Sequence, residues 1–368
     1  MMKSTEPRAA QRAHEPATED AAGAVAGRTL TRPLEGLRGW IISDGKAGSE
    51  SQATGIATAL GLAFEVKRVA PGGLYRLIAP WGPPDPKLRL GEAGSDFAPP
   101  WPDVAIAIGR RSAPVLRALR HRSDGRSFAV MLLDPKAGRG IADVIWVPEH
   151  DRLRGDNVIT TPTSPHPFTP ERLAALRSQT PPEIAALAGP RVAVLVGGRT
   201  RVFRYTDADH ARFAEALDAL GAAGASLMIT TSRRTHAELA DIARAAAGRY
   251  PSLLFDGDGP GPNPYAEFLA QADAIFVTAD SISMTGEAAA TGRPVHVFHP
   301  SRGSAKFDRF HRALEAVGAT RRWTAAFDEA ASLFEGGGEP IDPTAEIARE
   351  IGVRYNRWRR QHGVAEEK

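Results

Sequence analysis

One short apolar segment, together with the residues that follow it, restricts the possible folds of this chain more than any other feature. Residues 274–277 are continuously apolar, which is typical of a strand buried on both faces of a parallel sheet. Small hydroxyl residues come next, and residues 281–288 then have helical spacing. Open parallel sheets bind ligands beyond the carboxyl ends of their strands. The segment therefore predicts a strand–loop–helix unit of an α/β protein, with a binding site at the loop.

The start of this predicted helix favours an anionic ligand. Free N–H groups at a helix N-terminus, flanked by hydroxyls, bind groups such as phosphate. Glu287 falls in the first turns of the helix, where its carboxylate can accept hydrogen bonds from a pair of sugar hydroxyls. We therefore expect a nucleotide or nucleotide-sugar site in this part of the chain.

Length and composition exclude several classes of protein. A chain of 368 residues suggests two domains. The net charge of +3 gives no indication of nucleic-acid binding, and no segment approaches the ~20 apolar residues of a membrane span. Because there is no Cys, disulfides and Cys-ligated zinc are excluded. Only seven Lys are present, so the position of each one carries information.

Strand and helix patterns alternate through both halves of the chain, which indicates parallel sheets with right-handed crossovers. We expect strands at 39–43, 64–69, 103–109, 128–133, 144–147, 191–196, 226–229, 253–255, 274–277 and 294–298. Helices are expected at 49–60, from 110, and at 171–178, 207–220, 239–247, 265–271 and 344–359, with a long Pro- and Gly-rich irregular segment at 71–102.

This order predicts an α/β protein with two Rossmann-like domains facing a cleft. The expected parts are a disordered tail at 1–36, an acceptor-side domain at 37–165, a linker at 166–190, a nucleotide-sugar domain at 191–340 and a C-terminal helix at 341–368. The tail lacks the apolar core of a secretory signal, so we expect a cytoplasmic protein, peripheral to the inner membrane.

Two further strand ends in the second half carry similar chemistry. Gly197 and Gly198 would let the backbone approach a phosphate, and Arg199 could pair with it. The alternative is a tight turn with a solvated Arg. One strand later, Thr231, Ser232 and Arg233 repeat the pattern, and the alternative there is a capped helix start. We take the three strand ends together as one predicted site.

In the first half, the loop at 44–48 is the strongest candidate for chemistry. Asp44 could act as a general base, and Lys46 could hold a phosphate or an acidic acceptor. The glycine spacing fits neither a Walker A loop nor a dinucleotide fingerprint, and an ordinary Asp-Gly turn is the alternative. Residues 134–138, after another predicted strand, have a similar sequence with Asp134 and Lys136 in the same spacing. Lys306, in a predicted loop after the last strand, could touch a pyrophosphate or be simply solvated.

Metal and serine-hydrolase chemistry find no support. His296 and His299 are close in sequence, but no H-E-x-x-H pattern is present and no metal site is expected. A G-x-S-x-G elbow is also absent.

The chain resembles the bacterial members of the mitochondrial fission "elongated mitochondria" family. The resemblance extends over residues 37–358, and the segments that carry it are 40–48, 196–198, 229–235 and 277–288. For plant relatives, that family implies recruitment of fission machinery to the mitochondrial surface. Members are often labelled nucleoside-diphosphate-sugar epimerases, but the Tyr-x-x-x-Lys pair of such enzymes is missing here.

The second half is also similar to the donor-binding domain of GT-B glycosyltransferases of peptidoglycan and lipopolysaccharide assembly. That resemblance implies that Gly197 and Gly198 form the Gly-rich turn and that Glu287 holds the ribose. It assigns the phosphate loop to Ser281, Ser283 and Met284. The catalytic base of the first domain has no clear counterpart, and Asp44 is the best candidate.

The resemblance implies a metal-independent glycosyltransferase that uses a nucleoside-diphosphate sugar, for a cell-envelope glycan or lipid, without a cofactor. Its expected partners are the nucleotide-sugar donor and a lipid-linked acceptor or membrane surface, with no nucleic acid. The alternative is a non-catalytic GT-B-like scaffold that recruits partners at a membrane surface.

Overall fold

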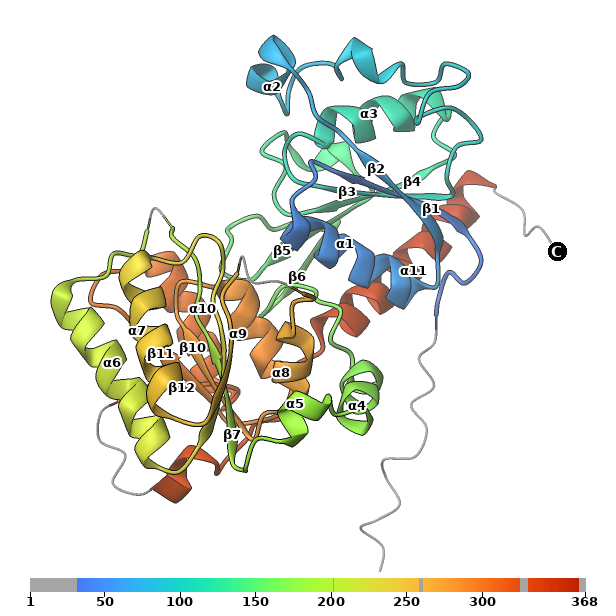
Figure 1. The fold of residues 1–368 in the computed structure, drawn as a ribbon. Helices are drawn as coiled ribbons and strands as arrows, with labels where there is room; N and C mark the ends of the chain where they lie inside the picture. The colour runs from blue at the N-terminus through green and yellow to red at the C-terminus, as the bar shows by residue number, and fades with distance from the viewer. Residues whose placement is uncertain (1–31, 201, 258–260, 325–329, 364–368) are drawn as a thin grey trace, which may run out of the picture. The chain divides into compact units, whose positions relative to one another are not determined.

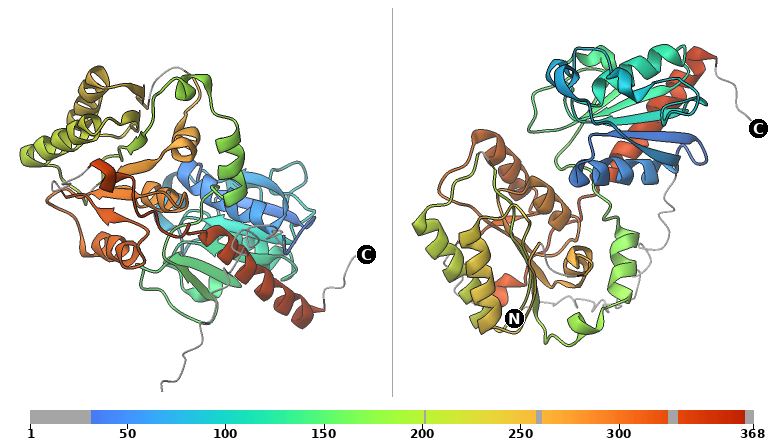
Figure 2. Two further views of the ribbon diagram at one scale, coloured as in Figure 1. Left: turned by 90° about the horizontal axis from the view of Figure 1, so that it is seen from below. Right: turned by 45° about the horizontal axis from the view of Figure 1, so that its top comes forward.

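The structure is a computed structural model that describes residues 32–200, 202–257, 261–324 and 330–363. Most of the expected tail lies outside the described residues. Within them the chain forms two six-stranded, wholly parallel sheets, each covered by helices on both faces (Figures 1 and 2). The expectation of an α/β protein with two Rossmann-like sheets is confirmed.

The first sheet has the strand order β2-β1-β3-β4-β5-β6. Its strands are β1 (Arg38–Ser43), β2 (Ala63–Arg68), β3 (Val104–Ile108), β4 (Phe128–Leu132), β5 (Val144–Pro148) and β6 (Val158–Thr161). The helical segments in this part are α1 (Ala47–Leu60), α2 (Gly73–Ile78), η1 (Pro86–Leu88), α3 (Ala113–Arg122) and η2 (Arg139–Ile141). Strands β3, β4 and β5 are buried along their whole length, as their uninterrupted apolar sequences predict.

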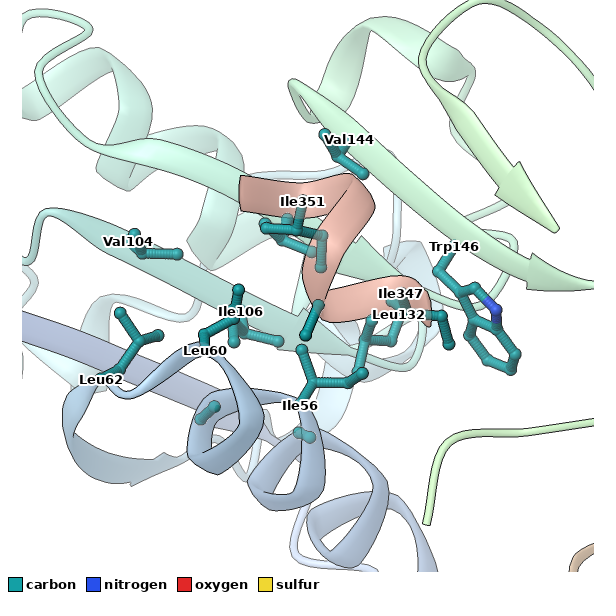
Figure 3. Packing of buried hydrophobic residues seen from close by; sticks show 14 of the residues in the cluster. Ile56, Leu60, Leu62, Val104, Ile106, Leu132, Val144, Trp146, Ile347 and Ile351 are labelled. Atoms are coloured by element: carbon teal, nitrogen blue, oxygen red, sulfur yellow. The ribbon is translucent and has the colours of Figure 1, made fainter. Parts of the chain in front are cut away.

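The C-terminal helix α11 (Pro343–His362) completes the first sheet, although it comes last in the chain. It lies beside α1, and its Ile347 and Ile351 pack with Ile56 of α1 against the sheet (Figure 3). Leu34 joins the same core, so the chain is already packed by that point of the sequence. The helical pattern predicted α11, but nothing local predicted which sheet it covers.

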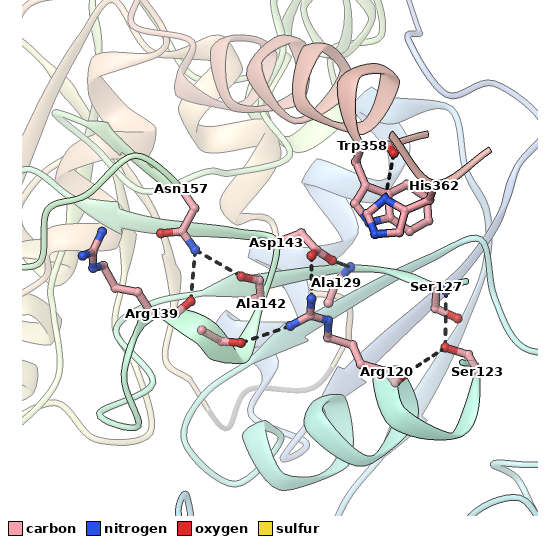
Figure 4. Close-up of polar contacts among 11 residues, drawn as sticks. Arg120, Ser123, Ser127, Ala129, Arg139, Ala142, Asp143, Asn157, Trp358 and His362 are labelled. Carbon is pink, nitrogen blue, oxygen red and sulfur yellow. Dashed lines mark hydrogen bonds and ion pairs between the residues drawn. The ribbon is translucent and has the colours of Figure 1, made fainter. Parts of the chain in front are cut away.

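Helix α3 covers the opposite face of the first sheet, and Asp143 fixes its position. The Asp143 carboxylate accepts a hydrogen bond from the Ala129 backbone N–H at 2.8 Å and pairs with Arg120 of α3 at 2.7 Å (Figure 4). One carboxylate thus joins the C-terminal half of α3 to the strands β4 and β5.

The second sheet has the strand order β12-β11-β10-β7-β8-β9. Its strands are β7 (Arg191–Leu195), β8 (Ser226–Thr230), β9 (Ser252–Phe255), β10 (Ala274–Thr278), β11 (Val295–Phe298) and β12 (Arg321–Arg322). The helical segments that accompany it are α4 (Pro170–Ser178), α5 (Pro182–Ala185), α6 (Asp207–Ala222), α7 (Ala237–Arg249), α8 (Tyr265–Gln271), α9 (Ile282–Ala289), α10 (Ala305–Ala316) and η3 (Ala330–Leu333).

The sequence analysis did not predict the elements β6, β12, α2, α5, α10, η1, η2 and η3, and three of them show why. Lys306 does not lie in a loop but in the first turn of α10, which begins after Ser304 and buries only Phe310, His311 and Leu314. Because charged residues surround these few apolar positions, their helical spacing is hard to recognise in the sequence. Strand β6 has only four residues, and α2, within the expected irregular segment, buries none of its side chains. A weak apolar pattern therefore explains each of these three omissions.

The strand orders mark one ligand-binding position in each sheet. In an open parallel sheet, ligands bind where successive connections leave in opposite directions. In the first sheet that position lies between β1 and β3, because β2 is on the other side of β1. In the second it lies between β7 and β10, because β8 and β9 extend the other way. We call these two positions the first crevice and the second crevice.

Candidate functional site

The second crevice brings together the loop after β7 and the loop after β10. The Gly197 N–H donates a hydrogen bond to Thr278 Oγ1 at 2.8 Å, which fixes the first loop to the end of β10. A Cβ atom at Gly197 would lie only 2.5 Å from Asp280 Oδ2, so a side chain is sterically excluded there. Gly198 similarly faces Ser232 Oγ and Arg234 of the loop after β8. The structure thus places the three predicted strand ends in contact.

Asp280 is a central residue of the second crevice. Its carboxylate is almost fully buried and accepts a hydrogen bond from the Tyr205 hydroxyl at 2.8 Å. Burial raises the pKa of Asp280 above its ordinary value. The His236 ring lies 5.4 Å from the Tyr205 ring, centroid to centroid. Sequence reasoning did not select Asp280 as a site residue, although its place after an apolar strand was the available signal.

Helix α9 begins at the second crevice. Ser281 is its N-cap and accepts a hydrogen bond from the Met284 N–H at 3.4 Å, while Ser283 is exposed in the first turn. Glu287, one turn further, accepts a hydrogen bond from the hydroxyl of the half-buried Tyr265. Burial raises the pKa of Glu287 to about 7. The predicted phosphate loop and ribose carboxylate therefore share one helix, and the carboxyl group changes charge near neutral pH.

In the loop after β8, the predicted hydroxyls already have partners. Thr231 Oγ1 donates to Asp256 at 2.9 Å, and Ser232 Oγ lies 3.1 Å from Thr235 Oγ1. Both hydroxyls thus stabilise the local turn. The arginines on either side of this contact, Arg199 and Arg233, have exposed side chains. The guanidinium groups, rather than the hydroxyls, are therefore the groups of this loop region that a ligand can reach.

The first crevice contains the predicted Asp44 and Lys46, on the loop between β1 and α1. The Asp44 side chain is only 5% exposed and pairs with Lys46 at 2.6 Å. Arg111, from the loop after β3, approaches the same carboxylate at 3.9 Å. These groups line an open pocket of about 340 Å³ together with Arg76, Leu77 and Arg110.

The arginines of the first crevice were missed by the sequence analysis. Arg110 and Arg111 follow the last residue of the predicted strand directly, which is the same strand-end signal that selected Asp44. Arg76 carried no such signal, because it lies on the unpredicted α2.

Two other lysines singled out in the sequence have carboxylate partners. Lys306 pairs with Asp151 at 2.5 Å, and Lys136 pairs with Asp134 of its own loop at 2.5 Å. Neither of these pairs includes a residue of the second crevice, so the amino group of Lys306 is occupied away from the predicted donor site.

The described residues include no group of three or more His, Asp or Glu side chains arranged to hold a metal ion. Among the same residues, no helix combines the length and the apolar character that crossing a membrane requires.

Solved structures with the same fold include two enzymes with bound nucleotide or nucleotide-sugar ligands. The chain resembles the UDP-GlcNAc 2-epimerase of Neisseria meningitidis bound to UDP-GlcNAc, with a TM-score of 0.51 and 11% identity, over 87% of this chain and 99% of that one. It also resembles the catalytic domain of starch synthase IV of Arabidopsis thaliana bound to ADP and acarbose, with a TM-score of 0.50 and 10% identity, over 88% and 99%. At such low identity the likeness establishes the fold alone, which is GT-B-like.

A curated relative is nearer in sequence. The mitochondrial fission protein ELM1 of Arabidopsis thaliana is 29% identical over 274 residues, which are 68% of this chain. The match spans 63% of the length of that relative. The model of the family described as Mitochondrial fission ELM1 matches residues 47–355, and the chain therefore belongs to that family.

Proposed function

We propose that this protein is a metal-independent glycosyltransferase that uses a nucleoside-diphosphate sugar. The donor binds at the second crevice, and the acceptor, a lipid-linked precursor of the cell envelope, binds at the first. The observation that carries the proposal is topological: the motifs predicted from the sequence occupy the ligand-binding position of both sheets.

The donor's diphosphate would lie between the Gly197–Gly198 turn and the start of α9. Exposed arginines flank that position, and the first N–H groups of α9 add a partial positive charge. Glu287 would accept hydrogen bonds from the ribose hydroxyls. We leave Lys306 and Thr231 out of the donor contacts, because Asp151 and Asp256 already bind them.

In the proposed reaction, the bond between the sugar's anomeric carbon and the diphosphate oxygen breaks, and a bond to the acceptor oxygen forms. The electron pair of the broken bond leaves on the nucleoside diphosphate, whose negative charge Arg199, Arg233 and the α9 N-terminus would stabilise in place of a metal. Asp44 would take the proton of the acceptor hydroxyl. Lys46 would position Asp44 through their 2.6 Å pair.

The UDP of one GT-B-like neighbour's ligand and the ADP of another support a nucleotide as the ligand of the second crevice. They do not distinguish among bases, so the test must include several donors.

A thermal-shift measurement with UDP-, GDP-, ADP- and CMP-sugars tests the donor site, since a ligand at about 100 times its Kd stabilises the folded chain by about 2.7 kcal/mol. We expect one nucleotide class to raise the Tm. Glu287→Ala should abolish this rise, whereas Asp44→Ala should preserve it. Glu215→Gln, an exposed carboxylate on α6, is the matched control. No shift with any donor at millimolar concentration contradicts the proposal, and loss of the shift in Asp44→Ala contradicts the assignment of donor and acceptor to separate crevices.

Family membership favours a second candidate, a non-catalytic scaffold that recruits partners at a membrane surface, because the curated relative is named a mitochondrial fission protein. Release of nucleoside diphosphate in the presence of donor and cell-envelope lipid extract separates the two. A scaffold gives no release above the level of Asp44→Ala.

A further inference from the structure

The pocket of the first crevice has a strong excess of positive charge. Lys46, Arg76, Arg110 and Arg111 line it together with a single carboxylate, Asp44. The carboxylate pairs closely with Lys46 and at longer range with Arg111. Within the described part of the chain, the side chains of Arg76 and Arg110 make no ion pair or hydrogen bond, and both are exposed. The pocket is therefore complementary to an anion that carries more than one negative charge.

The N-termini of two helices add to the positive potential of the pocket. Helices α1 and α3 both begin at the first crevice, with Lys46 and Ser112 as their N-caps, and neither N-cap side chain accepts a hydrogen bond from its helix. The Ser112 hydroxyl donates instead to the Ile108 carbonyl oxygen. The N–H groups of both first turns are thus left to stabilise an anion held by the arginines.

One side of the pocket is apolar and faces solvent. Helix α2 contributes Arg76 and Leu77 to the lining, and Leu77 is 70% exposed. Leu74, one turn earlier, is 64% exposed, and Trp81, just after the helix, is 66% exposed. These are three of the seven exposed large apolar side chains in the described residues, and they fall within eight consecutive positions of the chain. An exposed apolar cluster of this kind marks an interaction surface.

The apolar cluster is held in a fixed place beside the pocket. Arg117 of α3 donates hydrogen bonds to the carbonyl oxygens of Trp81, at 2.9 Å, and of Gly82, at 2.5 Å. The carboxylate of Asp85 accepts a hydrogen bond from the Gly72 N–H at 3.0 Å, which closes the base of the segment. The segment that carries the apolar side chains is therefore fixed to α3, and its Leu77 joins the apolar cluster to the lining of the pocket.

We propose that the first crevice binds the phosphate head of a membrane lipid, with Lys46, Arg76, Arg110 and Arg111 around a phosphomonoester and the hydrocarbon chain against Leu74, Leu77 and Trp81. The guanidinium groups match a phosphate because they can donate two parallel hydrogen bonds to it. This inference rests on the proposed function only where it identifies the lipid as the sugar acceptor. Binding itself needs no donor.

Co-sedimentation of the full chain with vesicles tests this directly, without any nucleotide. Phosphatidylcholine vesicles carry either phosphatidic acid, which has a phosphomonoester head, or phosphatidylglycerol, which has a phosphodiester. We expect binding at least tenfold tighter to the phosphatidic acid vesicles than to either other composition. The double variant Arg76→Gln/Arg110→Gln should lose this preference, and Leu74→Ser/Leu77→Ser should reduce binding to all vesicles at least tenfold.

Matched controls come from other surfaces of the chain. Arg126→Gln changes an exposed arginine at the opposite end of the first sheet, and Val317→Ser/Val353→Ser removes two exposed apolar side chains away from α2. Both controls should bind like the unmodified chain. Equal loss in the controls, or equal binding to phosphatidic acid and phosphatidylglycerol, overturns the proposal.

A competition experiment with a soluble phosphate ester shows whether the bound phosphate belongs to a lipid or to a soluble molecule. Millimolar glycerol 3-phosphate should only weakly displace the chain from phosphatidic acid vesicles. If it binds as tightly as the vesicles do and the leucine variants bind it normally, the ligand is a soluble phosphate and the lipid assignment is wrong. If no donor raises the Tm but the chain still binds phosphatidic acid vesicles, the proposed reaction is wrong and the lipid-phosphate site stands. If a donor raises the Tm but the chain does not bind these vesicles, only the lipid-phosphate site is wrong.

Discussion

The two crevices occupy equivalent places in their sheets but differ in almost every physical respect. The first is open and basic, and at least two of its arginines have no partner within the described residues. The second is tightly packed, and its carboxyl groups, the buried Asp280 and the half-buried Glu287, each bind a tyrosine hydroxyl. Sheet topology thus decides where a ligand can bind, whereas the side chains after each strand decide which ligand it is.

The two crevices also differ in how their charged groups affect the stability of the folded chain. Unpaired arginines near the surface are solvated and cost little, whereas a buried carboxyl group must be hydrogen-bonded or neutral. The second crevice meets that requirement with tyrosines and raised pKa values. Substitutions in the second crevice should therefore change stability as well as donor binding, whereas substitutions in the first should change binding with little effect on stability.

The largest effect is expected from adding a methyl group at a glycine. Gly197→Ala should lower the free energy of unfolding by about 3 kcal/mol, because its Cβ would meet the Asp280 carboxylate, which Tyr205 holds in place. Gly48→Ala is the counterpart in the first crevice, where no atom lies within 4 Å of the added Cβ and helix propensity favours Ala. Urea unfolding compares them. Equal destabilisation would remove the contrast between a closed and an open crevice.

A second test uses pH. Because burial raises the pKa of Glu287 from 4.5 to about 7, folding favours its protonated form. The stability this contributes is complete below pH 4.5 and is lost as the pH rises through 7. Relative to the unmodified chain, Glu287→Gln should therefore gain about 3 kcal/mol of unfolding free energy between pH 4.5 and pH 8. A difference that is independent of pH over this range would show that the pKa of Glu287 is not raised in the folded chain.

A smaller loss is expected when the partner of Asp280 is removed. Tyr205→Phe leaves the buried carboxyl group without its 2.8 Å hydrogen bond, which should cost about 1 kcal/mol of unfolding free energy. Tyr75→Phe, on the α2 side of the first crevice, provides the comparison and should change stability by less than about 0.5 kcal/mol. If the two variants lose the same amount, the Asp280–Tyr205 contact contributes nothing particular to the second crevice.

The smallest effect is expected in the first crevice itself. Arg76→Gln and Arg110→Gln should leave the unfolding free energy within about 0.5 kcal/mol of the unmodified chain, because neither guanidinium has a partner to lose among the residues that the structure describes. At low salt a slight gain is expected, since like charges are removed. A clear loss of stability would mean that these arginines support the fold, and the contrast with the second crevice would fail.

The sequence predicted most strands of both sheets because parallel strands are buried on both faces, so each shows as an unbroken apolar run. The elements it missed lack such a run. Strand β6 is a short edge strand, α2 buries no side chain, and α10 hides a narrow apolar stripe among charges. Local patterns also gave no indication that α11, at the end of the chain, packs beside α1.

For the site, strand-end loops could be predicted, but the contacts among them could not. Asp44 and Lys46 were selected from their own loop, whereas Arg111 reaches Asp44 from a different strand end, 67 residues later in the chain. Likewise, the pairing of Lys306 with Asp151 joins the first turn of α10 to the loop after β5, and no local pattern connects these two segments. Which polar groups are free for a ligand is decided by such long-range partners.

The central claim is that a nucleotide sugar binds at the second crevice and not at the first. The most direct measurement is a crystal structure of the chain soaked with the donor that gives the largest thermal shift. We predict density for the diphosphate between the Gly197–Gly198 turn and the first turn of α9, with the ribose against Glu287. Density for the nucleotide among Lys46, Arg110 and Arg111 instead, with the second crevice unchanged, would contradict the account.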